Sequence, residues 1–168
     1  MRIQNKIVLG FAMVLGIASG ASAQGRRVPM NPDEVGVAIA LQVAGQPYHF
    51  EGKAACGHAP VASINNVMAE MWKVEQINPQ RAIMLTLWHP RNTSGDIFLL
   101  SVQTGDKGYI VDTMNSGRGS SVVGSGKVRF TTSGAGGTFT INATTAEGAA
   151  ITGTIKCSAF TAPMAEGG

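Results

Sequence analysis

The sequence predicts a mainly β domain: an antiparallel β-sandwich or small barrel of about eight strands, with one short amphipathic helix at residues 63–74. Three observations support this prediction. Apolar residues recur at every second position over much of the chain, Gly-rich turns separate these stretches, and strands do not alternate with helices. Short, closely spaced strands of this kind are typical of antiparallel sandwiches and barrels.

The strands are predicted in chain order from this alternation. The clearest lies at 35–43, where valine, isoleucine and leucine alternate with small or polar residues. Two later strands are apolar on both faces, which is typical of central strands that are covered on both sides; they lie at 81–89 and 96–103. The full set of predicted strands is 35–43, 48–56, 81–89, 96–103, 109–113, 127–130, 138–143 and 151–157.

Residues 63–75 have a different period. Their apolar side chains follow the i, i+3, i+4, i+7 and i+8 spacing of one helix face, and Ser63 is a suitable N-cap. A short strand at 71–77 is the alternative. We favour the helix and expect it to cover one face of the central strands. Its apolar stripe consists of Ile64, Val67, Met68, Met71 and Trp72.

The first 23 residues have the organisation of a cleavable signal peptide. A basic start precedes an apolar run at 7–18, and the sequence Ala-Ser-Ala at 21–23 is a small-residue cleavage site. The apolar run is too short to cross a bilayer, which needs about 20 residues. We therefore expect a bacterial, Sec-exported protein that is secreted or periplasmic and begins at Gln24 after processing.

One domain is expected after the signal peptide. Residues 24–34 contain two prolines and no periodicity, which predicts a flexible N-terminal segment. The single β domain is predicted at 35–161. The small and polar residues at 162–168 predict a disordered tail.

The two cysteines, Cys56 and Cys157, are predicted to form a disulfide, because an exported chain folds in an oxidising compartment. Alternation places Cys56 on the strand face that carries Tyr48 and Phe50, and Cys157 on the face that carries Ile155. Both sulfur atoms should then point into the core. No C-x-x-C motif is present, so a structural bond is favoured over redox chemistry.

Charge and composition exclude some classes of partner. The chain has 13 Lys and Arg against 10 Asp and Glu, but Arg2 and Lys6 belong to the predicted signal peptide, which leaves a nearly neutral domain. Arg26 and Arg27 are the only adjacent basic pair, whereas a nucleic-acid binder needs a clustered basic face. We expect no nucleic-acid partner, and no membrane insertion after signal cleavage.

No recognisable catalytic motif is present. The Gly-rich stretch 117–126 lacks the Gly-Lys-Ser/Thr ending of a phosphate-binding loop, and no G-x-S-x-G motif occurs. We therefore assign no catalytic residue, metal ligand or cofactor. The candidate ligand groove lies near Trp72 and Trp88, which would meet if the helix packs on the sheet. Core packing is the alternative role for both tryptophans.

These observations favour an exported, non-catalytic β module that binds a ligand or interacts with the cell envelope or surface. Its site would be the tryptophan groove or the Thr-rich outward faces of the late strands, and its ligand a small molecule, a glycan or a protein. The sequence gives no oligomeric state. Two alternatives stay open: an envelope-acting hydrolase without a recognisable motif, and a periplasmic copper- or zinc-binding protein. The candidate residues are Asp112, Glu70 and His89 for the hydrolase, and His49, His58 and methionines for the metal protein.

The segment 136–158, rich in glycine and threonine, resembles the closing strands of small exported bacterial β domains such as mycobacterial surface lipoprotein antigens. The lipid-attachment cysteine of those proteins is absent here. The resemblance implies an exported β domain and assigns no role to any residue.

Overall fold

The computed structural model describes residues 34–64, 66–91, 95–114 and 123–162. These residues form nine strands and no helix, and every pair of neighbouring strands is antiparallel in one sheet of order β6-β5-β4-β3-β2-β1-β9-β8-β7. The strands are β1 (Glu34–Val43), β2 (Gln46–Ile64), β3 (Val67–Asn78), β4 (Arg81–Pro90), β5 (Ile97–Thr104), β6 (Lys107–Asp112), β7 (Ser125–Ser133), β8 (Gly136–Thr144) and β9 (Ala150–Cys157).

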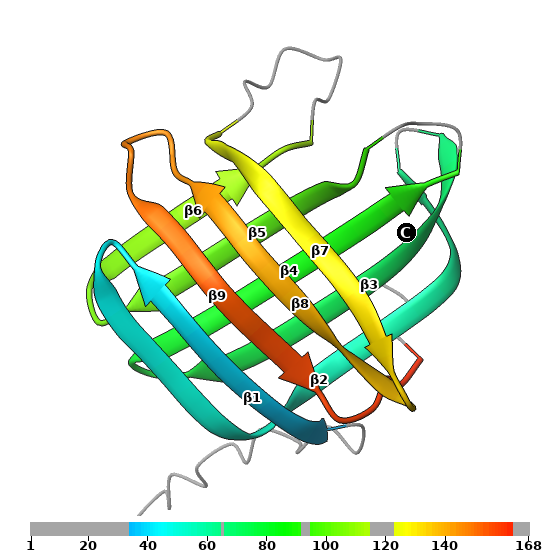
Figure 1. The fold of residues 1–168 in the computed structure, drawn as a ribbon, viewed down its shortest axis with the longest axis horizontal. Coiled ribbons are helices and arrows are strands. Elements are labelled where there is room, and N and C mark those ends of the chain that lie inside the picture. Colours follow the sequence, from blue (N-terminus) through cyan, green and yellow to red (C-terminus); the bar gives the residue numbers. More distant parts are fainter. Residues whose placement is uncertain (1–33, 65, 92–94, 115–122, 163–168) are drawn as a thin grey trace, which may run out of the picture. The chain divides into compact units, whose positions relative to one another are not determined.

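The sheet curls into a nearly closed barrel. In Figure 1, β7, β8, β9 and β1 run obliquely across β3, β4, β5 and β6, and we call these two groups the β9 layer and the β4 layer. The edge strands of the sheet meet at one end, where Asp112 and Val123 exchange backbone hydrogen bonds of 2.7 and 3.0 Å. This bridge joins the end of β6 to the chain just before β7.

The long strand β2 belongs to both layers. Its residues 46–55 pair with β1 and its residues 55–64 pair with β3. The register with β3 shifts between Ala59 and Ala62, which marks a β-bulge, and bulges bend a strand and increase its twist. The bend carries the chain from one layer into the other (Figure 1).

The core lies between the layers and follows the predicted alternation. The inward residues of β1 and β4 are almost fully buried, and Trp72 of β3 reaches Phe130 of β7 across the interior, with 4.7 Å between ring centroids. Side chains from the two layers therefore fill the inside of the barrel. The inward residues of β1 and β4 are Val37, Ile39, Leu41, Val43, Ile83, Leu85 and Leu87.

The predicted helix at 63–74 is wrong. From Val67 onward this segment forms β3, which pairs with β2 on one side and β4 on the other. The spacings i+4 and i+8 are even numbers, so a short stretch of apolar residues can satisfy a helix and a strand at once. Hydrogen bonding to two neighbouring strands makes this segment a strand. With β3 included, the described residues form nine strands, where about eight were predicted.

Several predictions fall on other parts of the chain. The signal peptide at 1–23, most of the segment 24–34 and nearly all of the tail at 162–168 lie outside the described residues. In the described part of the chain, no helix has the length and apolar character needed to span a bilayer.

Candidate functional site

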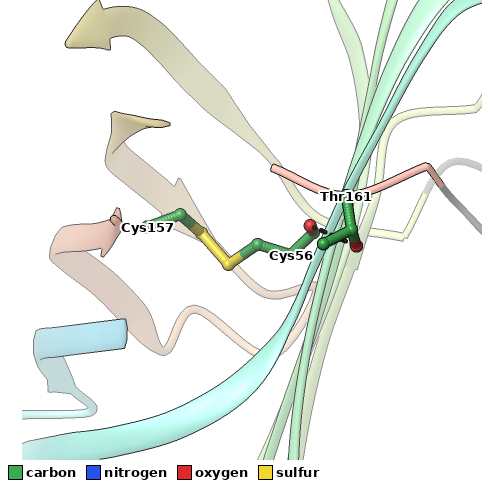
Figure 2. The surroundings of a disulfide bond; sticks show 3 residues. All are labelled: Cys56, Cys157 and Thr161. Atoms are coloured by element: carbon green, nitrogen blue, oxygen red, sulfur yellow. Dashed lines mark hydrogen bonds between the residues drawn. A yellow bond between two sulfur atoms is a disulfide. The ribbon is translucent and has the colours of Figure 1, made fainter. Parts of the chain in front are cut away.

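The predicted disulfide is present. Cys56 of β2 and Cys157 of β9 are bonded, with 2.01 Å between their Sγ atoms, and both side chains are buried. The bond ties the bend of β2 to the end of the β9 layer (Figure 2). A disulfide of this kind fits an oxidising, extracellular-type environment.

The chain after the disulfide pairs with β2. Thr161 donates its backbone N–H to the carbonyl of Cys56 at 2.9 Å, and its own carbonyl accepts the N–H of His58 at 2.9 Å. The Thr161 hydroxyl also donates to the Cys56 carbonyl at 3.2 Å (Figure 2). This pairing supplies a partner for β2 just beyond the point where its pairing with β1 ends. The ring of Phe160 lies 5.6 Å from that of Phe130 and belongs to the packed interior.

The structure does not bring Trp72 and Trp88 to one groove. Trp72 pairs with Leu87, and both are buried inside the barrel, whereas Trp88 pairs with Met71 on the opposite face of the sheet. Trp72 packs in the core, where its ring stacks on that of His58 at 5.2 Å. The predicted groove depended on the helix, and without it the two indoles point in opposite directions.

Two of the histidines sit in a polar row on the inner face, near one end of the barrel. His58 Nε2 lies 2.7 Å from a carboxylate oxygen of Glu70, and His89 Nδ1 lies 2.6 Å from one of Asp96. Glu70 and His89 are direct cross-strand partners on β3 and β4. The row therefore holds two His–carboxylate pairs side by side, partly open to solvent.

The residues proposed for the hydrolase and the metal protein are only partly brought together. Glu70 and His89 are neighbours, but Asp112 lies on another strand, where its carboxylate accepts the backbone N–H of Met114 at 2.7 Å. His49 faces outward on β2, away from His58. Among the described residues, no three His, Cys, Asp or Glu side chains are grouped so that they could hold a metal ion.

One titratable group lies deep in the core and links β2 to β3. Tyr48 donates its hydroxyl to the side-chain carbonyl of Gln76 at 2.5 Å, and both residues are buried. Burial raises the pKa of the Tyr48 hydroxyl, and the nearby charge of Arg81 lowers it by a smaller amount. The pair is a structural contact within the barrel and is not open to a ligand.

A groove runs along the outer face of β1. Its floor is formed by Gly36, Ala38 and Ala40, which have side chains too small to fill the space between longer neighbours. Two adjoining hollows of about 360 and 430 Å³ share Ala38 and the flanking residues Glu51 and Lys156. A strand rises about 3.3 Å per residue, so the floor extends for about 13 Å. We call this feature the β1 groove.

The walls of the β1 groove are polar and of opposite charge. Strand register places Glu51 of β2 on one side of Ala38 and Lys156 of β9 on the other, about 10 Å apart across two strand spacings. In the next row, His49 and Thr154 flank Ala40 in the same way. Donors and acceptors therefore line both sides of an elongated, open trough.

The polar surface continues from the groove over β9, β8 and β7. The outward residues next to Lys156 and Thr154 are Thr138 and Thr140, and Arg129 of β7 follows in the row of Thr140. The sequences of β7, β8 and β9 contain no Asp or Glu. The outer face of the β9 layer is thus rich in hydroxyl groups and positive in charge.

Comparisons with protein-family models, with curated proteins and with solved structures find no match to this chain. The β1 groove therefore rests on its own geometry. The sequence carried a signal for it, because the outward positions of the strand at 35–43 are glycine, alanine and glutamine. The identity of the walls, however, depends on which strands pair with β1.

Proposed function

We propose that this chain is an exported, non-catalytic binding module that holds an acidic glycan of the cell envelope in the β1 groove. The observation that carries the proposal is the trough along β1, with small residues on its floor and hydrogen-bonding side chains on both walls. The disulfide and the signal-like N-terminus support a secreted or periplasmic location.

The pairing of β1 favours a glycan over an extended peptide. Peptides commonly bind a β-sheet by adding a strand to a free edge, but β1 is hydrogen-bonded to β2 on one side and to β9 on the other. Recognition in the groove must then come from side chains. Threonine, histidine, glutamate and lysine together offer the donors and acceptors that sugar hydroxyls need.

The charge of the β9 layer favours an acidic chain over a neutral one. Lys156 stands on the groove wall, Lys127 and Arg129 lie further along the same layer, and β7, β8 and β9 contain no acidic residue. Glu51 on the opposite wall is an acceptor for hydroxyl groups. Attraction between exposed charges is screened by salt, so binding should weaken as ionic strength rises.

Calorimetric titration with a soluble oligogalacturonate and with a neutral cello-oligosaccharide tests this function. We expect the exported protein to bind the acidic oligosaccharide more tightly, and the Ala38→Trp variant to lose at least about tenfold in affinity because the indole fills the groove. Gln103→Trp, at an exposed position of β5, is the matched control. Failure of both oligosaccharides to bind, or equal binding by Ala38→Trp, would contradict the proposal.

The row of His–carboxylate pairs supports a second candidate function, hydrolysis. A carboxylate that holds one ring nitrogen of a histidine orients the imidazole, which can then act as a general base. His89, held by Asp96 and more than half exposed, is the residue placed for this role. Turnover of chromogenic glycosides or esters that disappears in His89→Ala would support it. Absence of turnover, or turnover that survives the substitution, would exclude it.

A further inference from the structure

The outer face of the β4 layer carries large apolar side chains among polar ones such as Thr86, Ser101 and Gln103. Met71, Trp88 and Ile97 form one cross-strand row on β3, β4 and β5, and Leu99 follows Ile97 on the same face. Two further side chains on this face are exposed, Met84 by 40% and Ile110 by 50%. We call these six residues the β4 face. Large apolar side chains gathered on an exposed sheet face mark an interaction surface.

The chain's own sequence offers little to cover the β4 face. Within the described residues no helix lies over it, because that part of the chain is all strand and turn. Outside them, the segments 24–33 and 115–122 are short and mostly polar or glycine. The apolar run at 7–18 belongs to the predicted signal peptide. These segments therefore offer few apolar side chains to the β4 face.

The charges of the β4 layer indicate what kind of molecule fits. The charged residues at outward positions of its four strands are Lys73, Glu75 and Asp112. Lys73 and Glu75 form an ion pair with each other at 3.0 Å, so the face carries little net charge. A strongly acidic or basic partner has nothing to bind there. An identical face, apolar and nearly neutral, meets no repulsion.

The size of the face is sufficient for a small interface. Four strands spaced about 4.8 Å apart, with about eight residues each at 3.3 Å, present roughly 500 Å². Two such faces in contact, polar positions included, bury at most about 1,000 Å² in total because the sheet is curved, which is near the lower limit for a specific interface. Sheets stack face to face at a spacing of about 10 Å with interdigitated side chains, as in a β-sandwich.

We propose that two copies of this chain associate through their β4 faces around a two-fold axis. In such an interface each copy presents the same patch to the other. Met84 lies in the middle rows of the face, and Trp88 lies in the row at the end of β4. The proposal does not depend on glycan binding, since the β1 groove lies on the other layer and stays open in the dimer.

Sedimentation equilibrium over a wide range of protein concentration tests the dimer directly. We expect the exported protein to dimerise reversibly, and the double variant Met84→Lys/Ile110→Lys to dimerise at least about 100-fold more weakly, because it places four lysines in the interface. The matched control Thr138→Lys/Thr140→Lys carries the same charges on the β9 layer and should dimerise like the parent. Circular dichroism and thermal melting establish that both variants fold.

Three outcomes would overturn the proposal. The first is a monomer at every concentration, and the second is a dimer that the Met84/Ile110 variant leaves unchanged. The third is a monomer that binds phosphatidylcholine vesicles through this face, with binding lost in the same variant, which would assign the face to a lipid surface.

Discussion

The two layers of the barrel are alike inside and different outside. Inward positions in both layers carry buried aliphatic and aromatic side chains. Outward positions of β7, β8 and β9 carry mainly Thr, Asn, Lys and Arg, whereas those of β3, β4 and β5 include large apolar residues such as Met84, Trp88 and Leu99 among polar ones. The inner alternation therefore specifies the fold. The outer faces differ in chemistry, which is the basis for proposing a polar ligand on one layer and a second copy on the other.

The largest expected effect on stability comes from removing the disulfide that links β2 to β9. Replacing both cysteines, Cys56→Ala/Cys157→Ala, removes the bond that ties β2 to β9 across 101 positions of sequence. We expect the free energy of unfolding to fall by about 2–5 kcal/mol, the range found when native disulfides are removed from small secreted domains. Urea unfolding followed by circular dichroism measures it. A loss below about 1 kcal/mol would mean that core packing alone holds the layers together.

The close approach of β9 to β1 depends on Gly153, which lies against the backbone of β1. Gly153 has a φ of +133°, and an added Cβ would lie 2.1 Å from the carbonyl oxygen of Ala40. We expect Gly153→Ala to cost about 1–3 kcal/mol or more, from backbone strain and steric clash together. Gly148→Ala is the control, because Gly148 also has a positive φ but open space around it. An equal loss in free energy of unfolding for the two variants would show that the close approach of β9 to β1 adds nothing to the cost of Gly153→Ala.

The buried hydrogen bond between Tyr48 and Gln76 should matter less than the disulfide. Tyr48→Phe leaves the side-chain amide of Gln76 in the core without its partner, at a cost of about 1–3 kcal/mol. Adding Gln76→Leu should recover part of this loss, since no polar group is then left unpaired. A double-mutant cycle measured by denaturant unfolding checks this coupling. Strictly additive losses would contradict it.

The same tyrosine predicts a dependence of stability on alkaline pH. Because the pKa of Tyr48 is raised above 10.0 in the folded protein, the unfolded chain loses this proton first. Stability from this group is complete below about pH 10 and falls as the pH rises toward the raised pKa. Melting temperatures measured on either side of pH 10 should show the fall in the parent. The slope should be smaller in Tyr48→Phe.

The smallest effects are expected from substitutions that give an outward residue of one layer the polarity typical of the other layer. Met84→Thr and Thr140→Val alter outward residues without touching the core, so each should change the stability of the monomer by less than about 0.5 kcal/mol. Denaturant unfolding of dilute protein measures this. A loss above about 1 kcal/mol in either variant would mean that the outer faces also specify the fold.

Much of the fold follows from side-chain alternation. Period two places Cys56, Cys157 and the residues of β1 on inward faces, and it therefore predicts the disulfide and most of the core. It fails at residues 63–74, where apolar residues four and eight positions apart fit a helix and a strand equally well. Only pairing with β2 and β4 resolves that ambiguity, and such pairing is a property of the whole sheet.

The candidate site depends on information that alternation does not hold. Alternation along each strand predicts that Glu51, Ala38 and Lys156 point outward. They are adjacent because β1 pairs with both β2 and β9, and β9 lies more than a hundred positions further along the chain. The failure of the tryptophan groove has the same origin. The groove requires Trp72 on a helix that packs over the strand of Trp88, whereas as members of adjacent strands the two residues face opposite ways.

The difference between the outer faces is tested most directly by oxidative footprinting of the protein in dilute and concentrated solution. The account predicts that Met84 and Trp88 become protected from oxidation as the concentration rises, while His49 beside the β1 groove stays equally reactive. Unchanged reactivity of Met84 and Trp88 in concentrated solution would contradict it, and so would equal protection of His49.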